Sequence, residues 1–384
     1  MLKRIISLAL TIVLLFSLSA CEKAGTELSQ LMIIQGIGID YKDDIYKVTV
    51  EILNNEQSGS PNGNSQSDNK TKIYSAQGKS ISEALRLLTT KSGNVPLFAH
   101  NRVIVINENL QEKSISHVME FFVRNYDSRV SQLLCVAKGK SAEDIIRARL
   151  LDDTVKSEIL ENLLEESYMQ SIVPRVRVID AVNILQNPLM SLCIPAVTVT
   201  DNGENEDYAL TGCALYNTNG QIASFITTQQ AKGLAFLSDS VKGGFLSGSL
   251  PNDEGITFLI NKSKTKYKVR VEDGKLIYSL VVNISCDIDE ISNVNLYETD
   301  IQLLNEIKAC IKKTISEKMK NTLEILQNNI DGDCIYFCKI LELKNNDLYQ
   351  EIKNNWQQLF PTIETEITVD VTIRRIGEEV LKGM

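Results

Sequence analysis

The sequence is poor in the residues that most often build active sites. It has only two histidines, His100 and His117, and one tryptophan among 384 residues. Neither histidine has a metal-ligand motif beside it, so we interpret both as structural or surface residues. No GxSxG nucleophile motif occurs. We therefore expect no catalytic residues, no metal and no bound cofactor, and we predict that the protein is not an enzyme.

Two glycines early in the chain form only a fragment of a nucleotide-binding motif. The run GIGID at 36–40 lacks the third glycine, and no helix start follows it. Glycines inside a strand more often allow close backbone packing or a bulge. We therefore predict a packing role for Gly36 and Gly38.

Long apolar runs are also missing, apart from one near the start. Residues 5–19 carry no charge and follow Lys3 and Arg4. Fifteen helical residues span about 22 Å, less than the roughly 30 Å of a membrane-spanning helix. This pattern is typical of a signal peptide, predicted here over 1–20. No later segment reaches 18 apolar residues, so the remainder is predicted to be an ectodomain.

The leader ends in a lipobox, Leu18-Ser19-Ala20-Cys21. Small residues before a cysteine are what a lipoprotein signal peptidase requires. We therefore predict that Cys21 is lipidated, with a diacylglyceryl group on the thiol and an N-acyl chain such as palmitate after cleavage. Two or three acyl chains make a stable anchor. The alternative is an ordinary secretory signal with an incidental cysteine.

The net charge bears on the possible binding partners, and the cysteine count bears on disulfide pairing. The formal net charge of −9 argues against nucleic acid, which calls for a basic face, and gives no reason to expect a polybasic contact with lipid headgroups. Seven cysteines follow Cys21, an odd number that precludes complete pairing within the chain. Most lie in apolar runs, so we predict buried free thiols.

Alternating strand and helix patterns predict an α+β fold with α/β-like layers, in which mixed sheets are flanked by helices. We expect about three domains. An N-terminal α/β domain covers 21–200 and contains a flexible polar loop at 54–70. The acidic segment 201–207 reads as a linker into a small middle α+β domain at 201–262. A C-terminal α+β domain covers 263–384 and includes a long helix at 296–329.

Several segments, taken in order, carry a resemblance to a known family. They are GIGID (36–40), FFVRNYDSR (121–129), VAKGKSAEDI (136–145), GCALY (212–216), QAKGL (230–234), NWQQLFP (355–361) and VTIRRIG (371–377). With the lipobox, this arrangement resembles the Ger(x)C family, the C subunits of spore germinant receptors.

The resemblance implies a protein lipid-anchored to the outer face of the spore's inner membrane. It also implies three α/β-type domains and work beside two integral membrane subunits, A and B, in sensing nutrients that trigger germination. The family is not known for enzymes. The chain departs from the family pattern in two places, at Glu22-Lys23-Ala24 directly after the lipid site and at the long 54–70 insertion. Both could alter how the folded domain is held by the segment that joins it to the lipid.

Five other residues are candidates for an interface or a structural role. Arg124 and Arg129 flank a helix end, where a guanidinium can bind a carbonyl or a carboxylate. Trp356 lies in an amphipathic helix and favours core packing. Arg374 and Arg375 are consecutive in a strand, so we expect one on each face, with one pairing to an acid. Each is weighed as structural first and as an interface residue second.

Two other functions remain open at this point. A solute-binding lipoprotein of a membrane transporter requires two similar lobes around a cleft, and the low aromatic content gives this little support. A cell-envelope hydrolase requires a nucleophile and a base, and no such set is visible. The favoured interpretation is a docking or assembly subunit whose anchor raises its local concentration at membrane partners.

Overall fold

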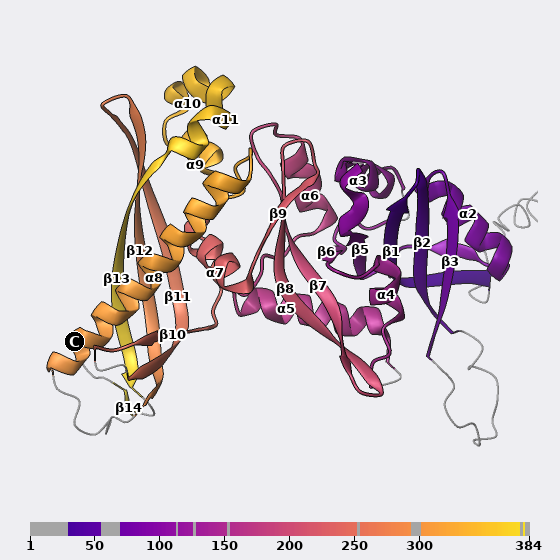
Figure 1. Cartoon of the computed structure of the whole chain (residues 1–384), viewed down its shortest axis with the longest axis horizontal. Coiled ribbons are helices and arrows are strands. Elements are labelled where there is room, and N and C mark those ends of the chain that lie inside the picture. Colours follow the sequence, from indigo (N-terminus) through magenta and orange to yellow (C-terminus); the bar gives the residue numbers. More distant parts are fainter. Residues whose placement is uncertain are drawn as a thin grey trace, which may run out of the picture.

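The computed structural model describes residues 30–54, 70–112, 114–125, 128–151, 154–251, 254–292, 301–376 and 379–380. Within these ranges the strands form one sheet of nine and one of five. The two sheets lie toward opposite ends of an elongated molecule, with α7 (Thr228–Leu237) between them (Figure 1). Mixed sheets flanked by helices confirm the predicted α+β, multi-domain class.

The larger sheet has four parallel strands at its centre and hairpins at both ends. Its order is β3-β2-β1-β5-β6-β7-β8-β9, with β4 beside β1. The bounds are β1 (Leu31–Lys42), β2 (Ile45–Leu53), β3 (Thr71–Gly78), β4 (Val95–Leu97), β5 (Val103–Asn107), β6 (Leu133–Ala137), β7 (Cys193–Asn202), β8 (Asn205–Tyr216) and β9 (Ile222–Ile226).

Helices cover both faces of this sheet, which explains why its central strands are apolar throughout. In β5, Val103 packs in one hydrophobic cluster and Ile104 in another on the opposite face. One face is covered by α2 (Ile81–Ser92), α3 (Ile115–Arg124) and α6 (Val178–Leu185), and the other by α4 (Ala142–Arg147) and α5 (Lys156–Met169). A 3-10 helix, η3 (Glu108–Glu112), follows β5.

Local hydrogen bonds and turn residues define the ends of several of these elements. Ser80 caps α2 by accepting the Glu83 N–H, and Ser141 caps α4 in a full capping box with Asp144. Asn219-Gly220 turns the chain between β8 and β9, and Gly220 has a φ of 75°.

The smaller sheet is built around a long hairpin. Its order is β10 (Phe245–Ser249), β11 (Gly255–Glu272), β12 (Lys275–Ile291), β13 (Glu364–Ile376) and β14 (Glu379–Val380), with β13 parallel to β12. One face packs against α8 (Ile301–Asn329), as Figure 1 shows. The connection to β13 contains α9 (Phe337–Lys344), α10 (Asn346–Ile352), α11 (Trp356–Leu359) and two 3-10 turns, η5 (Lys353–Asn355) and η6 (Phe360–Thr362).

The expected domain boundaries at 200/201 and 262/263 both fall inside continuous β structure. The acidic segment 201–207 is the tip of the β7–β8 hairpin and not a linker, since Asp201 pairs with Glu206 across it. The second boundary lies within β11. Turn residues and linker residues share the same polar composition, so composition alone did not separate them.

Some expectations fall partly or wholly outside the described residues. These are the leader, Cys21, most of the polar loop at 54–70, and the start of the helix expected from 296, which is described from Ile301. The seven later cysteines are all buried and free, as predicted.

Candidate functional site

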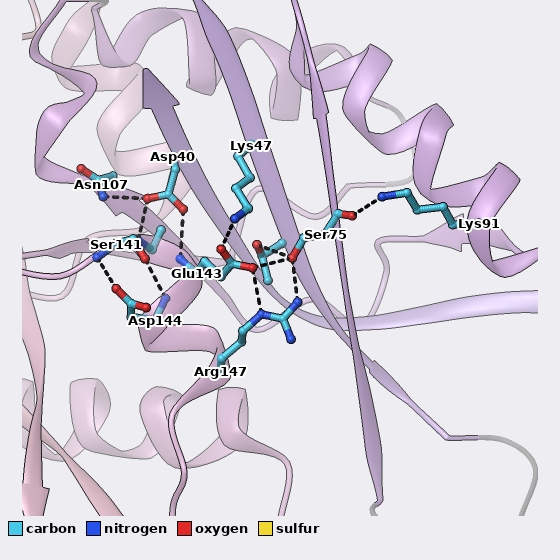
Figure 2. Close-up of polar contacts among 11 residues, drawn as sticks. Asp40, Lys47, Ser75, Lys91, Asn107, Ser141, Glu143, Asp144 and Arg147 are labelled. Atoms are coloured by element: carbon cyan, nitrogen blue, oxygen red, sulfur yellow. Dashed lines mark hydrogen bonds and ion pairs between the residues drawn. The ribbon is translucent and has the colours of Figure 1, made fainter. Parts of the chain in front are cut away.

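The carboxylate of Asp40, near the end of β1, binds the first turn of α4. It accepts hydrogen bonds from the backbone N–H groups of Ala142 (2.8 Å) and Glu143 (3.0 Å), and from the Asn107 side chain (2.6 Å). Figure 2 shows these contacts meeting at one carboxylate. Burial raises the pKa of Asp40, while the three hydrogen bonds oppose that rise. The residue thereby fixes α4 to two central strands.

Glu143, in the first turn of α4, extends the contacts to the outer strands. It bonds Lys47 of β2, Ser75 Oγ of β3 (2.9 Å) and Arg147 Nε (2.8 Å). Arg147 also donates to Ser75 Oγ at 2.9 Å (Figure 2). Burial works to raise the pKa of Glu143, but the bonds with Lys47, Arg147 and Ser75 hold it below its usual value. The group is therefore an ion-pair centre that ties α4 to β2 and β3.

Glu51 performs the same task for the next helix. Its side chain is fully buried, and it accepts the backbone N–H groups of Lys156 (2.9 Å) and Ser157 (2.7 Å) and the Ser157 hydroxyl (2.5 Å). A carboxylate at a helix N-terminus is favoured by the unpaired amides and the helix dipole. Polar and apolar residues alternate along β2, as in a strand with one solvent-facing side, yet Thr49 and Glu51 are both buried because α4 and α5 cover that side.

The two early glycines let these helices approach. A Cβ on Gly38 would lie 2.9 Å from the carbonyl oxygen of Ala142, and one on Gly36 would overlap the Ser157 side chain. The packing role predicted for both glycines is confirmed. Asp40, Glu51 and the glycines together form what we call the helix clamp.

The helix clamp holds structure and offers no visible reaction. Asp40 and Glu51 each accept three hydrogen bonds from donors of the chain itself, which use most of the roughly four acceptor sites of a carboxylate. Within the described part of the chain, no group of three or more His, Cys, Asp or Glu residues has the arrangement of a metal site. Rigid positioning of two helices on a sheet is what this arrangement can provide.

A large cleft lies elsewhere, between α2 and α3. Its volume is about 920 Å³, and aromatic side chains and charged groups line it together. Tyr41, Tyr46, Phe98 and Phe121 supply the aromatic part of the lining, and Arg124 is one of the charged residues that line it. A cleft of this size and mixed lining suits a small ligand or a partner side chain.

Two family models match the chain. One, described as the spore germination protein N-terminal domain, covers 25–199. The other, described as spore germination B3/GerAC like, C-terminal, covers 211–377. The chain belongs to the Ger(x)C family of spore germination proteins.

Its relatives match over nearly their whole length. Spore germination protein KC of Bacillus subtilis strain 168 is 26% identical over 91% of each chain, and spore germination protein B3 of the same organism is 25% identical over 91% of this chain and 92% of that protein. The crystal structure of the GerBC protein has a TM-score of 0.60 and 20% identity, covering 88% of this chain and 96% of that one. The Ger(x)C chain described here therefore shares the GerBC fold.

The helix clamp joins two of the segments that carry the Ger(x)C resemblance. The GIGID run ends in Asp40, and the KGKSAED run opens α4 at Ser141 and Glu143. These segments lie 102 residues apart in the sequence. Their contact gives a physical reason for both motifs: one supplies close backbone approach and a carboxylate, and the other supplies the helix N-terminus.

The two arginines of the FFVRNYDSR segment are exposed. Arg124 is at the end of α3 and pairs with Glu120 one turn earlier, at 2.5 Å. Arg129 lies beside a small polar recess that also includes His100, Arg102 and Glu161. Arg102 pairs with Glu161 at 2.5 Å. The structure thus places Arg124 and Arg129 at two separate sites and not in one.

Trp356 and the arginine pair have distinct environments. Trp356 is fully buried in the core beneath the smaller sheet, which agrees with the core role we favoured. Arg374 and Arg375 are both exposed. Alternation fails there because the β12–β13 register shifts, so that Cys286 pairs with Ile373 and Asp287 with Arg375.

Cys21 lies outside the described residues, so its lipidation stays a prediction. Among the residues that are described, no helix is both long and apolar enough to cross a bilayer. The sequence analysis missed Glu51 because its helix-capping role depends on a partner 105 residues away, so no local signal could have revealed it.

Proposed function

We propose that this chain is the lipid-anchored C subunit of a nutrient germinant receptor, acting by docking and assembly with integral membrane A and B subunits. The observation that carries the proposal is the family match along the chain together with the lipobox at Cys21. The proposal assigns the chain no catalytic step.

The physical mechanism is tethering. Nine peptide units join Cys21 to Gln30, where the described chain begins, and a fully extended chain of that length spans at most about 32 Å. An acylated Cys21 therefore keeps the amino end of β1 within that distance of the outer face of the spore's inner membrane. Confinement raises the effective concentration at membrane partners, so weak protein contacts suffice.

A ligand-binding role is the second candidate, because the cleft between α2 and α3 has room for a small molecule. The two lobes of a transporter-linked binding protein would be alike, whereas here one sheet has nine strands and the other five within the described ranges. Calorimetry of the chain from residue 22 onward with amino acids and sugars tests this candidate, and tight binding would favour it.

The decisive experiment compares Cys21→Ala with wild type in spore membranes. We expect the variant to lose both membrane retention and the integral proteins that co-purify with the wild type. Ser19→Ala is the matched control, because it changes the same leader but keeps a small residue before the cysteine. Retention of Cys21→Ala at the wild-type level would contradict the proposal, as would an unacylated Cys21 in mass spectra of the native protein.

A further inference from the structure

The five-stranded sheet has one covered face and one open face. Side chains of β12 at even positions from Leu276 to Ile288 are buried toward α8 and its neighbours. Those at odd positions from Ser279 to Asp289 are exposed or half-buried. A sheet face left without a helix or second sheet is available to another molecule.

A row of cations runs along the β11 side of this open face. From Lys262 to Arg270 every second residue of β11 is basic and exposed, and each pairs with an odd-numbered residue of β12. The row is Lys262, Lys264, Lys266, Lys268 and Arg270, opposite Ser285, Asn283, Val281, Ser279 and Ile277.

A complementary row runs along β13, on the other side of β12. At the same five levels it presents Thr372, Asp370, Thr368, Glu366 and Glu364, all exposed. At these five levels the open face therefore has a basic edge, a central strand without charge and an edge of acids and threonines; the charged positions Asp287 and Asp289 of β12 lie beyond them. Neighbouring strands are about 4.8 Å apart, so the two charged rows are separated by roughly 10 Å.

Only part of this charge is used within the molecule. Arg270 pairs with Glu366 at 2.7 Å across Ser279, and Lys264 pairs with Asp239. Glu364 pairs with Lys275 at 2.5 Å, so Asp370 is the one acid of the β13 row without an ion pair to another described residue. Lys262, Lys266 and Lys268 form no ion pair with any other described residue. Lysines on an exposed strand discourage unwanted strand pairing, but that purpose does not require a matching acidic row two strands away.

We propose that the open face is a docking surface for a second copy of this chain. When two such faces meet about a two-fold axis parallel to the strands, the β11 row of one copy lies over the β13 row of the other. An axis across the strands would instead oppose like rows. The first arrangement is an isologous contact between aligned sheets.

The match holds at each level. Lys264, Lys268 and Arg270 face Asp370, Glu366 and Glu364 of the second copy, while Lys262 and Lys266 face Thr372 and Thr368. Within these five levels no two like charges come together, whereas Asp287, at the next outward-facing position of β12, would lie opposite Asp287 of the second copy. The central strand contributes short or neutral side chains, including Ser279 and Val281, that let the faces approach.

The contact is small and electrostatic, so it is weak in solution. Three strands over nine residues cover about 30 Å by about 14 Å, or roughly 400 Å² per copy. The area buried on both copies together, roughly 800 Å², lies below the roughly 1,200 Å² at which stable interfaces begin. Association is therefore concentration-dependent and weakens with salt, because exposed charges are screened over about 10 Å at 0.1 M. A flat anionic membrane is a poorer fit, since the acidic row lies beside the basic one.

A charge-exchange experiment tests this arrangement. Two double variants exchange the charges of the rows. The acidic-row variant, Lys262→Glu with Lys266→Glu, places acids in the β11 row. The basic-row variant, Thr368→Lys with Thr372→Lys, places lysines in the β13 row. None of these side chains has an ion-pair partner among the described residues. We use the chain from residue 22 onward, which retains all residues of the three hydrophobic clusters and needs no lipid. Sedimentation velocity at low salt gives the association constants.

In pairs of the basic-row variant the new lysines face Lys262 and Lys266, so we expect its self-association to fall about tenfold or more. In the mixture, the substituted positions 262 and 266 of one chain face 372 and 368 of the other. The mixture should associate about tenfold more tightly than the basic-row variant alone, and 0.5 M salt should remove the difference. Lys312→Glu with Lys320→Glu, exposed on α8 on the covered side, is the matched control and should behave as wild type.

Three outcomes would overturn the proposal. One is a wild-type chain that stays monomeric at every concentration. Another is a mixture that associates no more tightly than its components, although circular dichroism shows both variants folded. The third is a wild-type chain that does not self-associate but sediments with phosphatidylglycerol vesicles, in a manner that depends on Lys262 and Lys266. That result would show that the open face binds a membrane. None depends on lipidation of Cys21, so failure here and failure of the proposed function are distinguishable.

Discussion

A buried carboxylate in the turn between α8 and α9 should make the stability of the C-terminal core depend on pH. Asp333 is fully buried, and it accepts backbone N–H groups from Ile335 (3.0 Å), Tyr336 (2.7 Å) and Cys338 (2.7 Å). Burial raises the pKa of Asp333 to about 6, although these hydrogen bonds oppose the rise. The perturbation we consider is Asp333→Asn, which removes the titration.

The magnitude follows from the pKa difference. A carboxyl group with a pKa of 3.8 in the unfolded chain and about 6 in the native chain binds more protons in the native state between those values. Its contribution to stability is complete below about pH 4 and is lost as pH rises through 6. A shift of about two units corresponds to about 3 kcal/mol of unfolding free energy.

Asparagine keeps one acceptor for Ile335 and Tyr336 but places an NH₂ group against the Cys338 N–H. That costs about 1–3 kcal/mol at any pH. The advantage of wild type over Asp333→Asn should therefore shrink by about 2 kcal/mol between pH 4 and pH 7, because a small part of the change already occurs below pH 4. Urea unfolding followed by the fluorescence of Trp356, which lies in the same core, measures it. An advantage that is constant or grows with pH would refute the reasoning. Asp347→Asn, at an exposed position, serves as control.

The helix clamp and the thiols give further predictions. Glu51→Gln should lower the unfolding free energy by about 2–4 kcal/mol, because an NH₂ group replaces an acceptor of buried N–H donors, and chemical denaturation against the exposed Glu272→Gln measures this. Gly38→Ala should destabilise by about 1–3 kcal/mol, since its Cβ meets the α4 backbone, and a thermal midpoint equal to wild type would contradict this. In the chain from residue 22 onward, a thiol reagent should label the seven cysteines only after unfolding, and rapid labelling of the native chain would refute their burial.

Features encoded within a few residues could be read from the sequence. The caps at Ser80 and Ser141 and the Asn219-Gly220 turn depend on local hydrogen bonding and backbone conformation, so a short window contains the whole signal. The packing role of Gly36 and Gly38 was also accessible, because an incomplete nucleotide motif inside a strand leaves few other reasons for two glycines.

Features that depend on distant partners could not be read in this way. Glu51 alternates with apolar residues as a solvent-facing side chain does, and only the arrival of α5 turns it into a buried cap. The lysines of β11 were overlooked because their alternation matters only when β13 lies two strands away. Arg374 and Arg375 defied alternation because a register shift in the neighbouring pairing is invisible in the sequence.

The long β7–β8 hairpin affects how this protein can be divided. The N-terminal family model ends at 199, within β7, and the C-terminal model begins at 211, within β8, yet these strands pair from Cys193–Leu215 to Asn202–Asn205. If the chain were divided between the regions of the two family models, the backbone hydrogen bonds between β7 and β8 would be lost. Each fragment would then expose an unpaired edge strand. The two fragments, expressed separately, should therefore aggregate or associate with each other. A chimera that takes one fragment from a relative must preserve the pairing of β7 with β8.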